Sequence, residues 1–519
     1  MANTISRRTF MERSALATGA VAAPAVLRGT AALAQSLPDP DKILSKITPG
    51  NYVKREYLDQ FGIGDDDLLW DPEKDWVRTA DWEAIRSEFA GQTTRLAIGA
   101  ADAESVSENL EPFRQLSGMN VEVVPIPDDS LFDKAITDFS SGAGAFDAIQ
   151  YFSPYLGDFA APGYLVDLTD YVDKWKFPID DFADTYRLNY GYFGDRLYGI
   201  PFDCDIQMMQ VRGKIFREIT GGDVASSGVI KTYDDVLRYA SELHKPDAGH
   251  SGVALMTQRG FWSTYTWQHV GAQYGLELFD ADWNPQFDSE ASAKACEVIL
   301  ELQKFAPTGV TGWGWPENRA AWLGGQTAMN IAWQDQGNQS TRPDQSTIWQ
   351  DEIVTLFEPM GTGPNARFAP PNIAGSTSSV AANAANPEAG FLVLAFFTTA
   401  SLQSMNGANA NGVGPGYKSV INNPNFQKIM VSAEVWAEEV DYCWCAPRIP
   451  GGLPIDIAFG NELNAIFTGN KSIKDALADG QARVRQVMER NGFYSGKPPV
   501  DYASIEPGLW LGRDKEPPV

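Results

Sequence analysis

Two aspartates and several tryptophans stand where a small molecule could reach them. Asp203 and Asp205 follow Gly199-Ile200-Pro201, a bend where proline removes a backbone donor and where we expect the chain to leave its sheet. Carboxylates accept hydrogen bonds from hydroxyl groups, and flat indoles cover the C–H faces of a polar ring. A hydroxyl buried without a partner costs ~1–3 kcal/mol, so a site for such a molecule needs many polar side chains. These residue types predict a binding site for a polyhydroxylated molecule.

The candidate ligand-binding residues are spread along the chain. They are Glu104, Gln150, Tyr151, Asp203, Asp205, Trp262, Trp313, Trp315, Trp333, Asp335 and Arg448. Arg448 is included because a guanidinium could bind an anionic group on the ligand. Glycosidases are also built from carboxylates and tryptophans, and a sequence does not measure the distance between carboxylates. A secreted carbohydrate-active enzyme therefore stays open as an alternative.

Motifs of several other chemistries are absent from the sequence. It contains no G-x-S-x-G, no H-E-x-x-H and no P-loop. The Gly-rich stretch 406–416 has no strand before it and no G-K-[ST] after it, which argues against a phosphate loop. Cys443 and Cys445 form C-x-C, but no histidine has a ligand-like spacing to them. We therefore expect buried thiols and neither a metal nor a cofactor.

The elements before Asp203 alternate between strand and helix patterns. Strands are predicted over 94–100, 121–126 and 145–151, and helices over 105–116 and 130–140. This is a β-α-β-α-β unit with a parallel sheet. Ligands of open parallel sheets lie beyond the carboxyl ends of the strands, which places Glu104, Gln150 and Tyr151 at a cleft. Helix capping and loop packing are the structural alternative for these three residues.

Capping and turn residues predict a hairpin and the helices that follow it along the chain. Gly194-Asp195 predicts a tight hairpin. Helices are predicted over 232–243, 289–304, 316–324, 386–398 and 472–489, and a strand over 327–333. Residues 493–519 contain five prolines and are expected to form a tail on the surface.

Residues 1–34 have the pattern of a twin-arginine export signal. Ser6-Arg7-Arg8-Thr9-Phe10 matches S-R-R-x-F, an Ala-rich apolar run follows, and Ala32-Leu33-Ala34 supplies a small-x-small cleavage site. Gly19, Pro24 and Arg28 interrupt the apolar run, which argues against a membrane anchor. We therefore expect the mature chain to be free in the periplasm, exported through the twin-arginine pathway.

The composition limits the partners and the number of domains. The formal charge of −26 argues against nucleic acid and anionic lipid as partners. A chain of 519 residues is long enough for two or three domain-sized cores. Residues 35–92 form an N-terminal extension with Trp70, Trp76 and Trp82, and we expect an arm that packs across a lobe through these tryptophans. A docking site for another protein is the alternative.

Several stretches resemble one protein family in the order in which they occur. Gly194 to Pro201 resembles its G-K-L-Y-G-I-P segment, and Asn386-Pro387-Glu388-Ala389 resembles its N-P-E-A-A helix start. Ala321, Trp322, Gly325, Ala328 and Met329 resemble its A-x-x-x-F-x-x-G-x-x-A-M pattern, with one departure from its spacing. Over about residues 93–490 the chain resembles the extracellular solute-binding proteins of ABC importers, in the sugar-binding branch that is similar to maltose-binding protein.

The resemblance implies a fold and its division into lobes. The fold is α/β, like the type II periplasmic-binding proteins, with two lobes joined by a multi-strand hinge around a ligand cleft. The expected lobe 1 comprises residues 93–202 and 332–380, and the expected lobe 2 comprises 203–331 and 381–519. Crossings between the lobes are expected near residues 201, 332 and 378.

The resemblance also implies a function. The chain would be the periplasmic substrate-binding component of an ABC importer and not an enzyme. It would act as a monomer, close its hinge over a carbohydrate or polyol, and deliver it to a membrane permease with its ATPase. A sugar-binding protein that serves a sensor is a further alternative.

Overall fold

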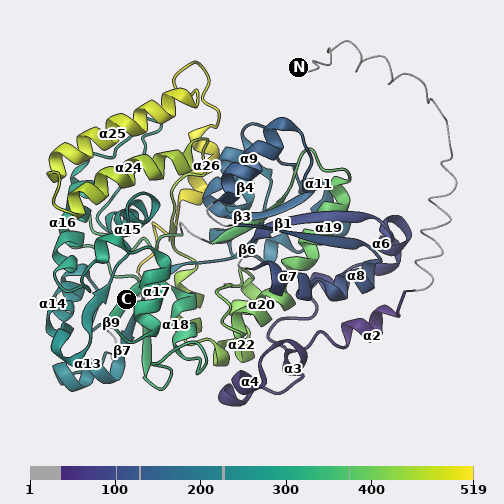
Figure 1. The fold of residues 1–519 in the computed structure, drawn as a ribbon, viewed down its shortest axis with the longest axis horizontal. Coiled ribbons are helices and arrows are strands. Elements are labelled where there is room, and N and C mark those ends of the chain that lie inside the picture. The colour runs from purple at the N-terminus through teal and green to yellow at the C-terminus, as the bar shows by residue number, and fades with distance from the viewer. Residues whose placement is uncertain (1–36, 101, 128–129, 225–227, 373–374, 518–519) are drawn as a thin grey trace, which may run out of the picture.

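A five-stranded and a four-stranded sheet, each covered by helices, form the centres of two lobes that lie side by side (Figure 1). The computed structural model describes residues 37–517 apart from 101, 128–129, 225–227 and 373–374. The predicted export signal, residues 1–34, lies outside the described residues. Among the described helices, none has both the length and the apolar character needed to cross a membrane.

The first lobe contains the predicted β-α-β-α-β unit. Its sheet has the order β2-β1-β3-β11-β6, with bounds Asn120–Ile126, Thr93–Gly99, Ala148–Phe152, Ser376–Val380 and Ile200–Asp203. Strands β1, β2 and β3 are parallel, and β11 is antiparallel to both β3 and β6. Helices α7 (Ala103–Asn109) and α8 (Glu111–Ser117) replace the single predicted helix, because Pro112 starts a new helix after Leu110.

Both faces of the first sheet are covered. On one face α19 (Pro387–Phe397) packs against β1, β3 and β11, and every residue from Ala389 to Phe397 is buried. On the other face α9 (Leu131–Ser141) and α10 (Leu156–Ala160) contribute to a separate apolar cluster. The further helices of the first lobe are α11 (Thr169–Trp175), α12 (Asp184–Tyr186), α20 (Ala400–Ala408), α21 (Lys418–Ile421), α22 (Pro424–Ile429) and α23 (Ala433–Glu439).

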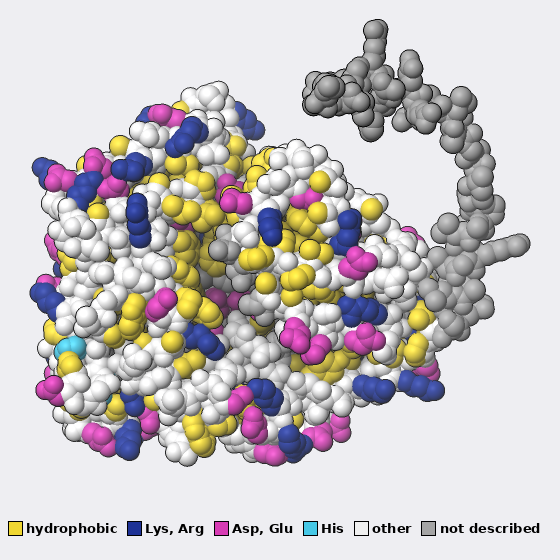
Figure 2. Space-filling model, in the orientation of Figure 1, with side chains coloured by type: hydrophobic (Ala, Val, Ile, Leu, Met, Phe, Trp, Pro, Cys, Tyr) yellow, Lys and Arg dark blue, Asp and Glu magenta, His cyan; other side chains and the backbone are white. Residues whose placement is uncertain are grey.

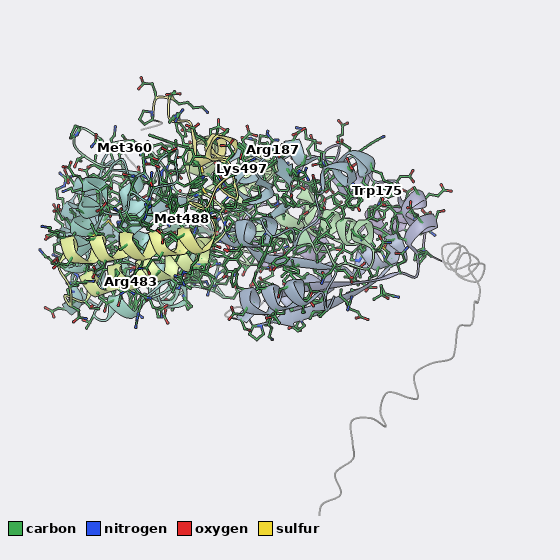
Figure 3. All side chains as sticks on the ribbon, turned by 90° about the horizontal axis from the view of Figure 1, so that it is seen from above. Trp175, Arg187, Met360, Arg483, Met488 and Lys497 are labelled. Carbon is green, nitrogen blue, oxygen red and sulfur yellow. The ribbon has the colours of Figure 1, made fainter. Side chains whose placement is uncertain are left out.

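The second lobe has a mixed sheet of order β10-β7-β9-β8, with bounds Ile353–Leu356, Gln207–Arg212, Thr327–Trp333 and Ser251–Ala254. Its helices are α13 (Gly213–Thr220), α14 (Tyr233–Leu243), α15 (Phe261–Ala272), α16 (Glu290–Gln303), α17 (Trp315–Leu323), α18 (Gln334–Ser340), α24 (Gly452–Phe467) and α25 (Ile473–Arg490). Thr232, Ser289 and Ser472 cap α14, α16 and α25 as the sequence predicts. From above, Arg483 and Met488 on α25 lie at one end of the molecule, and Trp175 of the first lobe lies toward the other (Figure 3).

The crossings between the lobes differ from the expected ones in two of three places. The first runs from β6 to β7, close to the predicted position. The second joins β10 to β11 instead of lying near residue 332, since β9, α18 and β10 all stay with the second lobe. The third follows α23 and leads to α24, whereas the expected crossing near 378 lies within β11.

The expected division of the chain therefore needs correction. Strand β10 belongs to the second sheet and not to the first lobe, because it pairs with β7. Residues 387–440 belong to the first lobe and not to the second, because α19 to α23 bury their apolar side chains in the same cluster as β1 and β3. Only the part after the third crossing, with α24 and α25, packs in the second lobe.

The segment from residue 191 to 203 contains the predicted hairpin. Strands β4 (Tyr192–Phe193) and β5 (Arg196–Leu197) pair across Gly194, whose φ of 63° is the left-handed conformation that a tight turn needs. The chain does not leave its sheet at Pro201, however, and β6 continues to Asp203. Strand β6 lies at the edge of the sheet, where a residue without an N–H group is tolerated, and its pairing with β11 is irregular at this point.

The N-terminal extension is part of the first lobe. It contains α2 (Pro40–Leu44), α3 (Pro49–Tyr52), α4 (Arg55–Phe61), α5 (Trp76–Thr79) and α6 (Trp82–Phe89). Trp70, Trp76 and Trp82 are buried in the core of the first lobe, and Trp82 packs against Phe113 and Phe396, as the sequence predicts for an arm that packs across a lobe.

The C-terminal segment is more ordered than a surface tail. Phe493 and Val500 are buried in the second core, and α26 (Tyr502–Leu509) follows. Strand β13 (Trp510–Leu511) then pairs with β12 (Cys443–Trp444) on the third crossing.

Candidate ligand-binding site

Three carboxylates come together where strands of the two lobes end. Asp203 ends β6, Asp205 lies in the first crossing, and Asp335 is in the first turn of α18, directly after β9. Asp205 and Asp335 are each 7% exposed. Figure 2 shows a hollow between the two lobes, with acidic side chains visible deep within it. The charges of Asp203, Asp205 and Asp335 act on one another, so these acids lie close together, and their shared role in a ligand site stays a prediction.

The protein satisfies only part of the hydrogen-bonding capacity of these carboxylates. The backbone N–H of Gly414 donates to Asp203 Oδ1 at 2.8 Å. Gln334 Nε2 donates to Asp205 Oδ1 at 3.3 Å, and Gln339 Nε2 donates to Asp335 Oδ2 at 3.1 Å. Asp335 Oδ1 is buried and has no hydrogen-bond partner among the described residues. Carboxyl oxygens accept hydrogen bonds, so donors on a bound molecule would pair with the oxygen atoms that the described protein groups leave without a partner.

Burial favours the neutral form of each acid, and repulsion between the acids adds to this effect at Asp203 and Asp205. Burial raises the pKa of Asp203 well above its ordinary value, and the charge of Asp335 raises it further. The hydrogen bond from Gly414 lowers this pKa but does not offset the other two effects. Burial and the charges of Asp203 and Asp335 raise the pKa of Asp205 in the same way. Burial raises the pKa of Asp335 to about 7, although the charge of Arg319 lowers it.

Aromatic rings stand beside the carboxylates. The ring centres of Trp262 and Trp333 are 6.1 Å apart at 71°, and Tyr265 lies 4.8 Å from Trp333. Burial raises the pKa of Tyr265, and the charges of Glu358, Asp205 and Asp335 add to the shift, which places the ring near the acids. The three rings form an edge-packed wall of the kind that covers the apolar faces of a ligand.

Trp313 and Trp315 lie next to this wall on either side of Gly314. A side chain at Gly314 would meet the indole of Trp262 at 2.7 Å, so the 313–315 segment passes close to that ring. Trp315 is half-buried, and the guanidinium of Arg319 lies 5.5 Å from its ring centre. Arg319 Nε donates to Gln339 Oε1 at 2.6 Å, which connects Trp315 to the side chain that binds Asp335.

The remaining four candidates are placed differently. Tyr151 is 1% exposed in the first core and bonds Ser379 Oγ at 2.8 Å, so packing accounts for its side chain. Gln150 is buried on β3 opposite Ser378, and Glu104 is exposed on α7. Arg448 lies on the third crossing, where it donates to the carbonyls of Asn372 and Ala446. Within the described part of the chain, none of these four side chains forms a hydrogen bond or ion pair with Asp203, Asp205 or Asp335.

The loop after α20 is not among the residues that the sequence predicts for the site. Gly412, Gly414 and Gly416 form a GxGxG piece within the Gly-rich stretch 406–416, which lacks the context of a phosphate loop. A side chain at Gly414 would meet the carbonyl oxygen of Cys204 at 2.5 Å, and one at Gly416 would meet Cys204 Sγ at the same distance. The glycines therefore allow this loop to lie against the first crossing, beside Asp203. The spacing of these three glycines is the sequence feature that indicates a close approach of backbone to backbone.

A family model described as bacterial extracellular solute-binding protein matches residues 96–404, more than half of the chain. The chain belongs to this family. A probable amino-acid ABC transporter periplasmic-binding protein, y4oP of Sinorhizobium fredii, is 26% identical over 421 residues, 79% of this chain and 92% of that protein. The erythritol/L-threitol-binding protein of Mycolicibacterium smegmatis is 24% identical over 253 residues, 44% of this chain and 50% of that protein.

Solved structures share the fold. A solute-binding protein of Agrobacterium radiobacter in complex with ribitol has a TM-score of 0.66 at 21% identity, covering 77% of this chain and 99% of its own. One of Agrobacterium vitis with bound D-mannitol has a TM-score of 0.66 at 20% identity, with 78% and 99% covered. The maltose-bound MalE3 of T. maritima has the same TM-score and identity, with 76% and 100% covered. The two-lobed type II periplasmic-binding-protein fold is thereby confirmed.

Proposed function

We propose that this protein is the periplasmic substrate-binding component of an ABC importer and that it binds a polyol or a sugar between its lobes. The observation that carries the proposal is the group of Asp203, Asp205 and Asp335 beside the Trp262–Trp333 wall. Hydroxyl groups would donate to the carboxylates, and C–H faces would lie against the rings. Family membership supports the transport role.

The charges of the site favour an uncharged ligand over an anionic one. Three carboxylates lie in the group, while Arg319 is turned toward Gln339 and Trp315. Arg448, the residue expected to bind an anion, donates to backbone carbonyls on the third crossing instead. The α-carboxylate of an amino acid would meet acidic side chains here in place of a guanidinium, and burying an anion without a cationic partner costs binding energy. Ribitol, D-mannitol, maltose and erythritol or L-threitol are named for similar proteins and carry no charge.

A thermal-shift panel of the mature protein tests the proposal. The panel contains erythritol, ribitol, D-mannitol and maltose, with L-amino acids as the second candidate class because y4oP is described as a probable amino-acid transporter protein. A ligand at ~100 times its dissociation constant stabilises the folded state by ~2.7 kcal/mol. We expect at least one polyol or sugar to raise the melting temperature and the amino acids to leave it unchanged. A shift with amino acids alone would replace the proposed ligand class.

Maltose, one compound of this panel, also tests the enzymatic alternative. Binding proteins of this kind release their ligand unchanged, so we propose that the protein has no hydrolytic activity. Incubation with maltose followed by chromatography of the products checks this point. Appearance of glucose would make the protein an enzyme and would contradict the proposal. A sensor role in place of transport would leave binding intact but would abolish the dependence of polyol uptake on this protein in cells.

Export and partners complete the proposal. We infer that residues 1–34 direct export through the twin-arginine pathway and that the mature monomer delivers its ligand to a membrane permease with an ATPase. The motif Ser6-Arg7-Arg8-Thr9-Phe10 supports the export route. Replacing Arg7 and Arg8 with lysine should retain the precursor in the cytoplasm, as measured by cell fractionation. Normal export of that variant would contradict the twin-arginine assignment.

A further inference from the structure

The N-terminal extension, residues 37–92, precedes the segment that the family model matches, residues 96–404. The similar solved structures are covered over 99–100% of their length but cover only 76–78% of this chain. A substantial part of this protein is therefore additional to the shared fold. Several hydrogen bonds of the extension reach the two ends of α20, the helix that precedes the Gly412–Gly416 loop.

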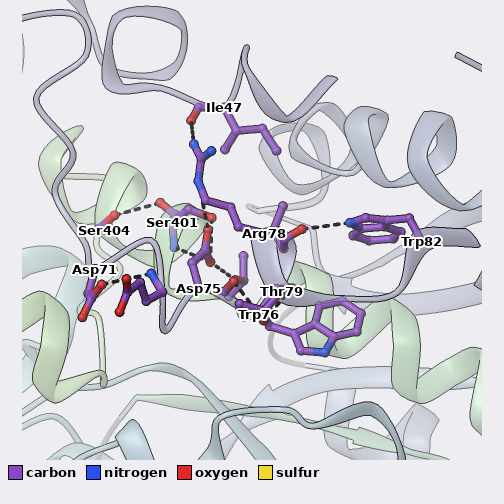
Figure 4. Close-up of polar contacts among 12 residues, drawn as sticks. Ile47, Asp71, Asp75, Trp76, Arg78, Thr79, Trp82, Ser401 and Ser404 are labelled. Carbon is purple, nitrogen blue, oxygen red and sulfur yellow. Dashed lines mark hydrogen bonds and ion pairs between the residues drawn. The ribbon is translucent and has the colours of Figure 1, made fainter. Parts of the chain in front are cut away.

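Asp75 of the extension binds the start of α20. It is fully buried, and its Oδ1 accepts hydrogen bonds from Ser401 N at 3.3 Å, from Ser401 Oγ at 3.1 Å and from Thr399 Oγ1. Thr399 is the N-cap residue of α20, and its own side chain caps none of the helix's N–H groups. Asp75 thus supplies the cap from a segment more than 300 residues away. Figure 4 shows Asp75 facing Ser401, with Arg78 beside it reaching to the carbonyl of Ile47.

The extension also holds the end of α20. Asn409, the C-cap residue, donates from Nδ2 to the carbonyl of Tyr52 at 2.7 Å, and its Oδ1 accepts from the N–H of Lys54 at 2.9 Å. Arg342 donates to the carbonyl of Ala408 at 3.2 Å. Its guanidinium lies 4.9 Å from the ring centre of Tyr57, also in the extension. Both ends of one helix are therefore fixed by the same additional segment.

Helix α20 connects these contacts to the ligand site. Gln403, which is fully buried on α20, donates to the carbonyl of Pro201 at 2.8 Å and accepts from the N–H of Gly416 at 2.9 Å. One side chain thus ties the strand that ends in Asp203 to the glycine loop. The loop in turn donates from Gly414 N to Asp203 Oδ1.

We propose that the N-terminal extension is a structural component of the ligand site: it fixes α20 at both ends and thereby holds the Gly412–Gly416 loop against Asp203, with Asp75 as a positioning residue. The extension then sets ligand affinity without touching the ligand. The inference rests on the proposed function in one respect, namely that the ligand binds at Asp203.

The experiment compares variants of the mature protein that lose one cap each. Asp75→Ala removes the cap of α20, and Asn409→Ala removes the contact at its other end. Asn409 is partly exposed, so that variant keeps the test open where Asp75→Ala fails to fold. Asp81→Ala is the matched control, because Asp81 caps α6 within the extension by accepting from Ala84 N at 2.9 Å. Asp75→Asn is the rescue variant, since its amide oxygen still accepts.

Three readouts separate a positioning role from a merely structural one. They are the melting temperature, the dissociation constants of ribitol and D-mannitol by calorimetry, and hydrogen exchange of the peptide covering residues 409–416. We expect Asp75→Ala and Asn409→Ala to weaken binding at least tenfold and to accelerate exchange in that peptide. Asp81→Ala should lower the melting temperature yet change the dissociation constant less than twofold, and Asp75→Asn should recover most of the affinity.

The outcomes that overturn the inference are distinct from failure of the proposed function. Wild-type affinity or wild-type exchange in folded Asp75→Ala and Asn409→Ala overturns it, as does an equal loss of affinity in Asp81→Ala. If the wild-type protein binds none of the polyols and sugars of the thermal-shift panel, the proposed ligand class fails by itself. Exchange of residues 409–416 then decides whether the extension positions the loop.

Discussion

At the scale of single residues, the acids of the site are held at a cost to the folded protein. Asp335 is 7% exposed, one of its oxygens has no hydrogen-bond partner among the described residues, and burial raises its pKa from 3.8 to about 7. Asp147, by contrast, accepts from the N–H groups of Arg95 and Ala385 and from the Arg95 guanidinium. These bonds outweigh burial and lower the pKa of Asp147. The two aspartates therefore have opposite effects on stability.

The pH dependence of unfolding follows from these shifts. Between pH 3.8 and about 7 the folded protein binds more protons at Asp335 than the unfolded chain does, so this residue lowers the free energy of unfolding as pH rises through that window. Asp335→Asn should raise the free energy of unfolding of the ligand-free protein by ~1–3 kcal/mol at pH 8 and leave it nearly unchanged at pH 4.

Thermal unfolding of the variant at both pH values measures this difference. Asp147→Asn is the control of opposite sign and should destabilise the protein at pH 8. Equal melting temperatures of Asp335→Asn and wild-type protein at pH 8 would show that Asp335 carries no such penalty. Asp335→Asn should also weaken polyol binding, because substitutions that stabilise a protein at its binding site commonly reduce its function.

At the scale of elements, the loop after α20 depends on close approach of backbone to backbone. Gly414 lies against the carbonyl of Cys204, and its φ is not in the left-handed region. A methyl group there would meet fixed backbone, so Gly414→Ala should destabilise the protein by ~1–3 kcal/mol and weaken polyol binding by displacing the N–H that binds Asp203.

Gly312→Ala is the matched control for that substitution. A side chain at Gly312 meets no atom within 4 Å, and its φ is also outside the left-handed region. The control should be neutral or slightly stabilising, because alanine restricts the unfolded chain more than glycine does. Chemical denaturation and calorimetry of both variants provide the comparison. A Gly414→Ala protein with wild-type affinity would show that the loop tolerates displacement.

Local signals predicted many of the elements, and long-range pairing explains the errors. Caps such as Thr232 and the apolar periodicity of the first strands and helices depend on neighbouring residues, so the sequence shows them directly. Strand β11 reads Ser-Thr-Ser-Ser-Val and is buried throughout, so alternation does not reveal it. Its place in the first sheet comes from pairing with β3, more than 200 residues earlier. The predicted crossing near residue 378 is therefore wrong, because these residues lie inside the first sheet.

The site was predictable to a similar extent. Asp203 and Asp335 directly follow strand patterns, and the structure brings these ends together. Tyr151 also lies on a strand near its carboxyl end, but its side chain points into the core, a choice that depends on the register with β11. Gly414 could not be assigned to the site from local pattern, because its partner Asp203 is 211 residues away.

At the scale of the whole molecule, the three crossings connect two lobes that already touch. The rings of Phe152 in the first lobe and Phe261 in the second are 5.3 Å apart. Asp158 of α10 accepts from Gly451 N at 2.7 Å on the third crossing. Burial raises the pKa of Asp158 to about 6, although hydrogen bonds from backbone N–H groups lower it. A rotation about the crossings can widen or close the hollow while the chain stays continuous.

Closure predicts a change of shape when ligand binds. The acids and tryptophans of the site are distributed over β6 of the first lobe, the first crossing, and α15, β9 and α18 of the second lobe. A saturating polyol that contacts both lobes should draw them together and lower the radius of gyration measured by small-angle X-ray scattering. Gly414→Ala, which disturbs the loop at Asp203 but leaves the crossings intact, should show no decrease at the same polyol concentration. Stoichiometric binding with an unchanged radius of gyration would contradict closure, because the ligand would then enter a hollow between lobes that do not move. Affinity would in that case depend only on the side chains that line the hollow.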